Sequence, residues 1–110
     1  MTTVVHCKKE KFDIYIGRPS GNSIEHYGNP FSHLRGSKAT VYLPSREECI
    51  KAHDEWFNGT AWQHIEPERR KWVLANIENL RDKVLACWCD PLPCHGDNYV
   101  KYLTLPSPKK

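Results

Sequence analysis

The stretch from Lys83 to Asn98, KVLACWCDPLPCHGDN, most constrains how this chain can fold. Its first part, Val84 to Trp88, is a short apolar run that follows a helical pattern, which predicts a buried strand. Pro91 and Pro93 prevent that strand from continuing, because proline lacks the N–H that a sheet requires. The rest of the stretch precedes the amphipathic run Tyr99 to Leu103. We therefore predict a strand, a tight loop and a helix N-terminus, an arrangement that commonly holds ligands in α/β proteins.

Further strand signals lie near the N-terminus and in the middle of the chain. Thr3 to Cys7 is apolar and β-branched, and Asp13 to Ile16 alternates polar with apolar residues, so both predict strands. Only Lys8 to Phe12 separate them, and so short a link favours an antiparallel hairpin. Thr40 to Leu43 predicts a short edge strand. The late strand, which enters after a helical crossover, should lie parallel to one of the early strands.

Two helices are predicted before the late strand. Ser45 and Glu48 can form a capping box, so a helix should run from Arg46 to about Asn58, where Gly59 ends it. A second helix should start with Pro67 in its first turn and run to about Arg81. This order predicts the α/β class, with a small mixed, Rossmann-like sheet covered by helices.

Length and charge narrow the range of functions. The 110 residues fit a single domain, which we place at residues 1–105, followed by a flexible tail at residues 106–110. A net charge of +3 suits an anionic small ligand without requiring DNA or RNA, so nucleic acid is not a favoured partner. No run approaches the roughly 20 apolar residues of a membrane span. Since the N-terminus also lacks an apolar signal region, we expect a cytoplasmic protein with no membrane partner.

Three of the five cysteines are crowded into the central stretch, which argues for thiols, a metal or a reactive site over a disulfide framework. Cys87, Cys89, Cys94 and His95 have the composition of a zinc site, although C-x-C is less typical than C-x-x-C. We favour the alternative that Cys87 and Cys89 are small buried hydrophobes, with no cofactor. In a third interpretation, Cys94 is a reactive thiolate near a helix N-terminus. We expect no structural disulfide among the three, because Cys87 and Cys89 lie about 6.5–7 Å apart along a strand.

His95 and Asp97 stand at the start of the last predicted helix. His95 could donate to a phosphate or a base, and Asp97 could accept from a ribose hydroxyl. Open amides from Gly96 to Asn98 would favour a phosphate. In the alternative interpretation, Asp97 or Asn98 is only the N-cap of the helix.

Two loops complete the candidate site. Gly17, Arg18 and Ser20 end the second strand, where Arg18 could grip a phosphate with two hydrogen bonds, or could belong to an ordinary surface turn. In the next loop Asn29 could read a base edge and Phe31 could stack on a ring, or the pair could be a turn and a core anchor. We expect four side chains from these loops and the last helix to line one pocket: Arg18, Asn29, His95 and Asp97.

The motifs IYIGR at residues 14–18, GNPF at 28–31 and CWCDPLPCHGD at 87–97 together resemble the domain of unknown function 4326 family. These are small proteins common in bacteriophages and bacteria, and the likeness extends to about Leu103. The stretch from Ser20 to Tyr27 is longer than the family's usual link. The resemblance implies the fold and one common site, but no established activity. That site would contain Gly17, Arg18, Asn29, Pro30, Cys89, Cys94, His95, Gly96 and Asp97.

The leading functional hypothesis is binding of a phosphorylated nucleotide-like small molecule. In the phage setting that the resemblance suggests, the protein could be a sponge that sequesters a host immune signal, such as a cyclic nucleotide or an ADP-ribose derivative, in the host cytoplasm. Formation of a homo-oligomer would help to enclose the ligand. One alternative is an enzyme acting on a nucleotide or on its N-glycosidic or phosphate bond, with Asp97 or Cys94 as the catalytic group and His95 as acid or base. Another is a zinc-stabilised interaction module.

Overall fold

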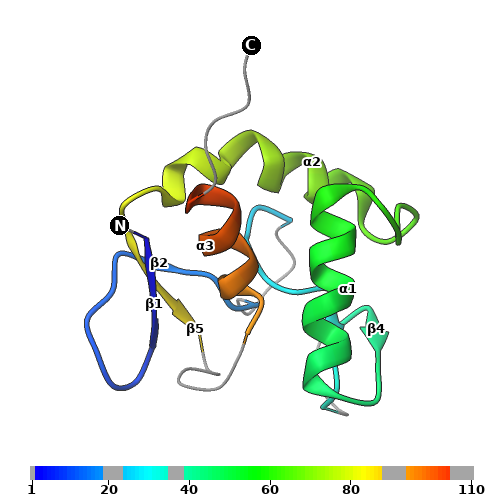
Figure 1. Cartoon of the computed structure of the whole chain (residues 1–110), viewed down its shortest axis with the longest axis horizontal. Helices are drawn as coiled ribbons and strands as arrows, with labels where there is room; N and C mark the ends of the chain where they lie inside the picture. Colours follow the sequence, from blue (N-terminus) through cyan, green and yellow to red (C-terminus); the bar gives the residue numbers. More distant parts are fainter. Residues whose placement is uncertain (1, 19–23, 35–38, 88–93, 105–110) are drawn as a thin grey trace.

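Strand β5 (Val84–Cys87) lies at the centre of a three-stranded sheet, between β1 (Thr3–His6) and β2 (Ile14–Tyr15) (Figure 1). The computed structural model describes residues 2–18, 24–34, 39–87 and 94–104 of the chain. Both pairs in this sheet are parallel, with Thr3 opposite Val84 and Ile14 opposite Leu85. The carboxyl ends of the three strands therefore meet at one edge of the sheet.

The prediction that the first two strands form an antiparallel hairpin is wrong. Strands β1 and β2 each pair with β5 and not with each other. Residues 7–13 return the chain to the amino end of β2, where the N–H of Asp13 donates to the carbonyl of Val84 at 2.8 Å. A link of this length reaches up to about 23 Å. Crossing two strand spacings and the length of one short strand needs only about 16 Å. A short link can therefore join parallel strands when the strands themselves are short.

A second, two-stranded parallel sheet is formed by β3 (Phe31–Ser32) and β4 (Val41–Tyr42). The edge strand predicted at Thr40 to Leu43 corresponds to β4, whereas β3 follows a Pro-containing turn and carries too few residues for a periodic signal. All described strand pairs are parallel, so the antiparallel member of the expected mixed sheet is absent from the described residues.

Helix α1 (Arg46–Asn58) begins and ends as its sequence predicts. The Ser45 hydroxyl accepts from the N–H of Glu48 at 3.1 Å and lies 3.2 Å from the Glu48 carboxylate, which is the capping box. Gly59 ends the helix in the left-handed region, at φ 82°, where a residue without a Cβ is favoured. Helix α2 (Pro67–Asn76) has proline in its first turn and continues into the 3-10 helix η1 (Ile77–Leu80).

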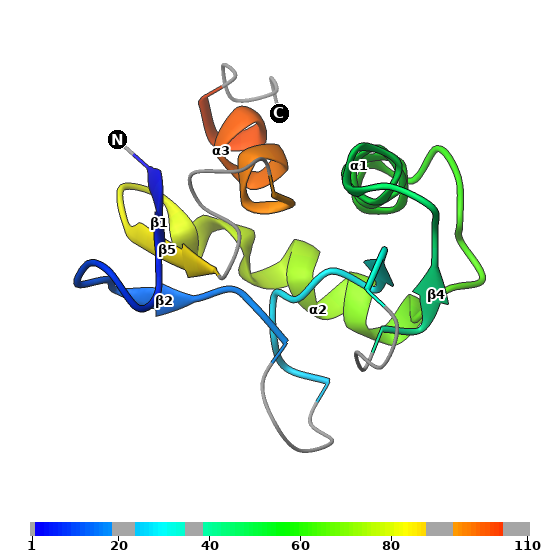
Figure 2. The same ribbon diagram turned by 90° about the horizontal axis from the view of Figure 1, so that it is seen from below.

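Helix α3 (Gly96–Thr104) packs against β1 and α1, and Figure 2 shows it over one face of the sheet. The core between these elements is unusually aromatic. Trp56 and Phe57 from α1 meet Tyr99 from α3, and the Phe57 and Tyr99 rings pack edge to face with their centroids 5.4 Å apart. Leu85 and Val73 complete the core from β5 and α2.

The expected α/β class is confirmed: the described residues form one compact domain with a small parallel sheet and three α-helices, a Rossmann-like arrangement. The proposed tail at residues 106–110 lies outside the described residues. None of the helices in the described part of the chain is long and apolar enough to cross a membrane.

Candidate functional site

A cavity of about 350 Å³ lies at the carboxyl ends of β2 and β5, the position where α/β sheets usually bind ligands. One wall is the chain leaving β2, from Tyr15 to Arg18, and another is the segment from Asn29 to Leu34. The first two turns of α1 form a third wall through Arg46, Cys49 and Ile50. Cys87 at the end of β5, together with Cys94 and His95 before α3, closes the cavity.

The polar lining of this cavity is basic. Arg18, His33 and Arg46 line it from different segments of the chain, and none of the described lining residues is acidic. Leu34, Ile50 and Phe31 supply apolar wall between these charges. A cavity with cationic and apolar surfaces side by side suits an anion that also carries an apolar or ring-shaped part.

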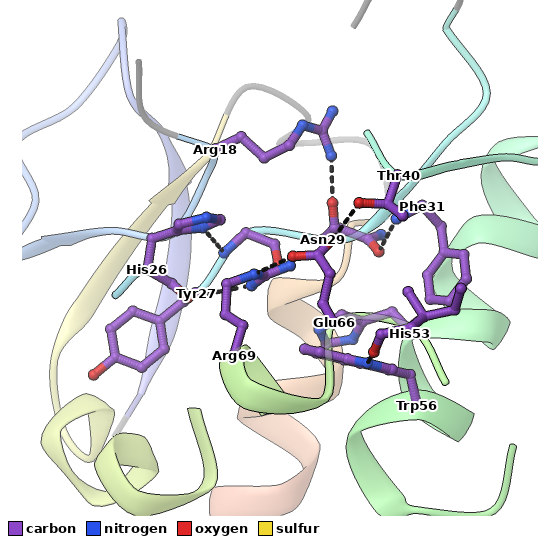
Figure 3. A network of polar contacts seen from close by, with 12 residues as sticks. Arg18, His26, Tyr27, Asn29, Phe31, Thr40, His53, Trp56, Glu66 and Arg69 are labelled. Carbon is purple, nitrogen blue, oxygen red and sulfur yellow. Dashed lines mark hydrogen bonds and ion pairs between the residues drawn. The ribbon is translucent and has the colours of Figure 1, made fainter. Parts of the chain in front are cut away.

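Arg18 ties two walls of the cavity together. Its Nη1 donates to the carbonyl of Asn29, so the guanidinium is anchored at one end (Figure 3). The side-chain Oδ1 of Asn29 accepts from the N–H of Phe31 at 2.9 Å, which fixes the turn between them. Only the Nδ2 group of Asn29 therefore remains to donate to a ligand. Phe31 is 1% exposed and packs edge to face on Trp62, so it forms a wall and not an open stacking surface.

Arg69 holds this turn from below, as Figure 3 shows. Although only 2% exposed, its guanidinium donates to the Gly28 carbonyl at 2.6 Å and to the His26 carbonyl at 3.2 Å. Its Nε donates to Glu66 at 2.7 Å, and its Cζ lies 5.2 Å from the centre of the Trp56 ring. The buried charge is thus paired and hydrogen-bonded, as burial requires.

Burial and the contacts of Arg69 determine the protonation states of His26 and Glu66. Burial and then the charge of Arg69 lower the pKa of His26 from 6.5 to about 4, so this ring is neutral and accepts from the N–H of Gly28 at 3.1 Å. Burial alone would raise the pKa of Glu66, but hydrogen bonds from Arg69 and Thr40 lower it overall. Glu66 therefore stays ionised and links α2 to the segment before β4.

A chain of hydrogen bonds connects Asn98, His53, Tyr99 and the Tyr27 carbonyl next to the cavity. Tyr99 donates its hydroxyl proton to the carbonyl of Tyr27 at 2.9 Å, so it accepts from His53 Nε2 at 3.1 Å. His53 Nδ1 then accepts from the side-chain amide of Asn98 at 2.9 Å. His95 Nε2 lies 2.8 Å from the carbonyl of Ile16 and 3.0 Å from that of Tyr27, so this nitrogen carries a proton and donates to them.

This chain of hydrogen bonds is structural in character. Burial holds the pKa of His53 well below 6.5, and burial also raises the pKa of Tyr99, so both groups stay neutral. His95 joins the ends of β2 and the Tyr27 segment through main-chain carbonyls. The Nε2 atom of His95 is thus engaged in holding the cavity walls, and only the remainder of its ring lines the cavity.

Two thiols meet at the cavity wall. The sulfur atoms of Cys87 and Cys94 lie 3.1 Å apart and are not joined in a disulfide. The N–H of Gly96 points at the Cys94 sulfur over 3.2 Å. Cys89, the third cysteine of the zinc hypothesis, lies outside the described residues. Within the described ranges, no three His, Cys, Asp or Glu side chains gather as metal ligands would.

The sequence-predicted residues fall into three sets: those that line the cavity, one that is outside the described residues, and those that do not line the cavity. Around the cavity the structure brings together six of them: Gly17, Arg18, Asn29, Phe31, Cys94 and His95. Ser20 lies outside the described residues. The remaining three, Gly96, Asp97 and Asn98, are not among the residues that line the cavity. Asp97 is exposed, and its Oδ2 accepts from the N–H of Cys94 at 3.1 Å, which is the capping alternative.

The expectation that the backbone N–H groups at the start of α3 are open to a ligand is wrong. The N–H of Gly96 points at the Cys94 sulfur, that of Asp97 donates to the Cys94 carbonyl, and that of Asn98 donates to the His95 carbonyl, each bond 3.0–3.2 Å long. Gly96 instead lets the helix approach the sheet, because a Cβ on it would lie 2.7 Å from Ile16 Cδ1. A phosphate would therefore have to find its donors on the other walls.

Sequence reasoning missed four residues of this region: Tyr15, Arg46, Arg69 and His53. Arg46 carried a usable signal, because the capping box places it in the first turn of a predicted helix, shortly after a predicted edge strand. Arg69 carried none, since its position in α2 looks like that of any solvated arginine. Its burial arises only when the turn at residues 26–29 folds onto α2.

Comparison with known proteins gives one family. The chain matches the family model described as a domain of unknown function, DUF4326, over residues 4–104. No curated protein and no solved structure matches it.

Proposed function

The chain belongs to the DUF4326 family, and from the cavity its described residues form we propose that it binds a phosphorylated, nucleotide-like small molecule. The observation that carries the proposal is that Arg18 and Arg46 line one cavity in which no described lining residue is acidic. Guanidinium groups on two walls of one cavity favour a phosphate, because each can donate several charge-assisted hydrogen bonds to it.

The size and shape of the cavity support a ligand of nucleotide size. A volume of about 350 Å³ falls within the usual range of small-molecule sites. With the phosphate between Arg18 and Arg46, the apolar wall at Leu34 and Ile50 would take the base, and Asn29 Nδ2 could donate to its edge. In this arrangement the ligand contacts Arg18, Asn29 and the start of α1, and not the backbone N–H groups of α3.

Binding without turnover is the form of this function that the site favours. Asp97 is exposed and outside the cavity lining, and His95 Nε2 donates to main-chain carbonyls, so neither is placed as a general base. A binder of this kind could act as a sponge for a signalling nucleotide, with cyclic nucleotides and ADP-ribose derivatives as the first candidates.

Calorimetry with AMP, 3′,5′-cyclic AMP, ADP-ribose and adenosine tests the proposal. At least one phosphorylated compound should bind, and adenosine should bind much more weakly. Arg46→Ala and Arg18→Ala should each weaken binding by about 1.5–3 kcal/mol, or roughly 10- to 150-fold. Arg18→Lys should recover only part of the loss, because the forked geometry is missing.

Lys51→Ala is the matched control for Arg46→Ala. It also removes one positive charge from α1, but at a side chain that is 79% exposed. Unchanged affinity in both arginine variants would refute the phosphate role, and a panel in which nothing binds would refute the proposal itself. Bound ligand should be recovered unchanged by mass spectrometry after denaturation.

The enzyme alternative keeps one supporting observation, which is the position of Cys94 in the cavity wall. If the recovered nucleotide is altered, Cys94→Ser should abolish that change while leaving affinity within a few-fold.

A further inference from the structure

We propose that Cys87 and Cys94 form a redox-active dithiol, which a small hydroperoxide converts reversibly into an intramolecular disulfide. The distance between their sulfur atoms, 3.1 Å, is only about 1 Å longer than a covalent S–S bond. Cys87 is the last residue of β5, and Cys94 lies two residues before the start of α3. This pairing involves two cysteines whose side chains already face each other.

The cavity gives a small oxidant its route to the pair. Cys87 and Cys94 are only 2% and 3% exposed, yet both line the cavity. A neutral molecule the size of hydrogen peroxide can enter through it, whereas a bulky protein disulfide cannot reach sulfur atoms buried to this degree. The substrate class is therefore a small peroxide.

Cys94 is the attacking thiol. The N–H of Gly96 points at its sulfur over 3.2 Å, and hydrogen bonds of this kind stabilise a thiolate more than a thiol. Helix α3, which starts two residues later, adds the positive end of its dipole.

The reaction balances with these two residues and one peroxide. The Cys94 thiolate attacks a peroxide oxygen, the O–O bond breaks, and Cys94 becomes a sulfenic acid while the other oxygen leaves as water after protonation. The Cys87 sulfur then attacks the Cys94 sulfur, and the sulfenic oxygen leaves as a second water. Two thiols are oxidised by two electrons, the peroxide is reduced, and a dithiol such as dithiothreitol reverses the step by exchange.

The test treats the intact protein with stoichiometric hydrogen peroxide and follows its thiols and mass. The thiol titre in denaturant should fall by two of the five cysteines, the mass should fall by about 2 Da, and dithiothreitol should restore both values. Asp-N protease cuts before Asp90, so the disulfide should join the peptide 82–89 to the peptide 90–96. Fragmentation of that linked pair should place the bridge on Cys87 and Cys94.

The variants assign the partners. Cys87→Ser and Cys94→Ser should abolish the linked peptides, and Cys89→Ser should retain them. Cys49→Ser, which removes a buried thiol from the same cavity, should oxidise as the wild type does. A bridge mapped to Cys89 in the wild type would overturn the proposal, as would oxidation that adds oxygen without a bridge, or a titre that peroxide leaves unchanged. Because the readout is the mass of the protein alone, this result does not depend on whether a nucleotide binds.

Discussion

Gly96 lies where the start of α3 packs closely against the sheet and the residue that follows β2. A Cβ at this position would lie 2.7 Å from Ile16 Cδ1 and 3.1 Å from Val4 Cγ2, and Ile16 is completely buried. The absent side chain therefore sets the distance between helix and sheet. It also lets the Gly96 amide lie next to the Cys94 sulfur.

Gly96→Ala should lower the free energy of unfolding by about 1–3 kcal/mol, the usual cost of an added methyl group in a packed core. Urea unfolding followed by circular dichroism measures this change. Lys101→Ala is the control in the same helix, because its side chain is 62% exposed and its ion pair with Asp54 lies at the surface. If Gly96→Ala were as stable as the wild type, the gain in helix propensity would outweigh the contact, and the proposed close packing would be refuted.

Residues next to one another in sequence have different roles here, which limited the prediction of the site. His95 lines the cavity, whereas Gly96 faces the sheet and Asn98 donates to the Ile50 carbonyl and to His53. The sequence identified the start of a helix at this point. It did not indicate which side of that start faces the cavity, because this depends on how the whole helix is rotated over the sheet.

At the scale of elements, Arg69 joins α2 to the turn that forms one wall of the cavity. It reaches the carbonyls of His26 and Gly28 with one nitrogen and the carboxylate of Glu66 with another. Glu66 in turn accepts from Thr40. One ion pair, Arg69 with Glu66, therefore connects helix α2 to the segments on both sides of β3.

Arg69→Met should destabilise the protein by about 3–5 kcal/mol, because Glu66 and two carbonyls lose a buried partner. Arg69→Lys should be destabilising by a smaller amount, since an ammonium group cannot make both sets of contacts at once. Chemical denaturation gives both values, with Lys71→Ala in the same helix as the exposed control. Equal stability of the lysine variant and the wild type would contradict the role of the forked geometry.

The helices were predictable from sequence, and so was a parallel pairing of the late strand with one early strand, but the pairing of both early strands with β5 was not. A capping box, a glycine and a first-turn proline are local signals, and they fixed the ends of α1 and the start of α2. The pairing of β1 and β2 with β5 depends on residues roughly 70–80 positions apart. Short links favour hairpins in general, and only the short length of these strands allows a parallel return here.

At the scale of the whole molecule, stability should depend on pH through His26 and His53. The pKa of His26 is lowered to about 4 and that of His53 lies well below 6.5, in each case mainly through burial. Both rings return to about 6.5 when the chain unfolds, so the unfolded state binds more protons between about pH 4 and 6.5. Stability should therefore rise with pH across this window and be lost as the pH falls from 6.5 towards 4.

Urea unfolding at pH 7.0, 5.5 and 4.5 measures this dependence. His26→Gln, whose side-chain oxygen can still accept from Gly28, should show a shallower slope than the wild type. A free energy of unfolding that is constant between pH 7.0 and 4.5 would contradict the neutral burial of these two rings.

The central position of β5 also affects how the protein is made. A ribosome completes β1 and β2 long before it reaches β5, because about 70 residues separate Tyr15 from Val84. At about 5–20 residues per second, this takes roughly 4–14 seconds. During that time the first two strands have no partner in the main sheet, while α1 and α2, whose signals are local, can already form. The nascent chain is therefore expected to assemble its helices first and to complete its sheet and cavity in one late step.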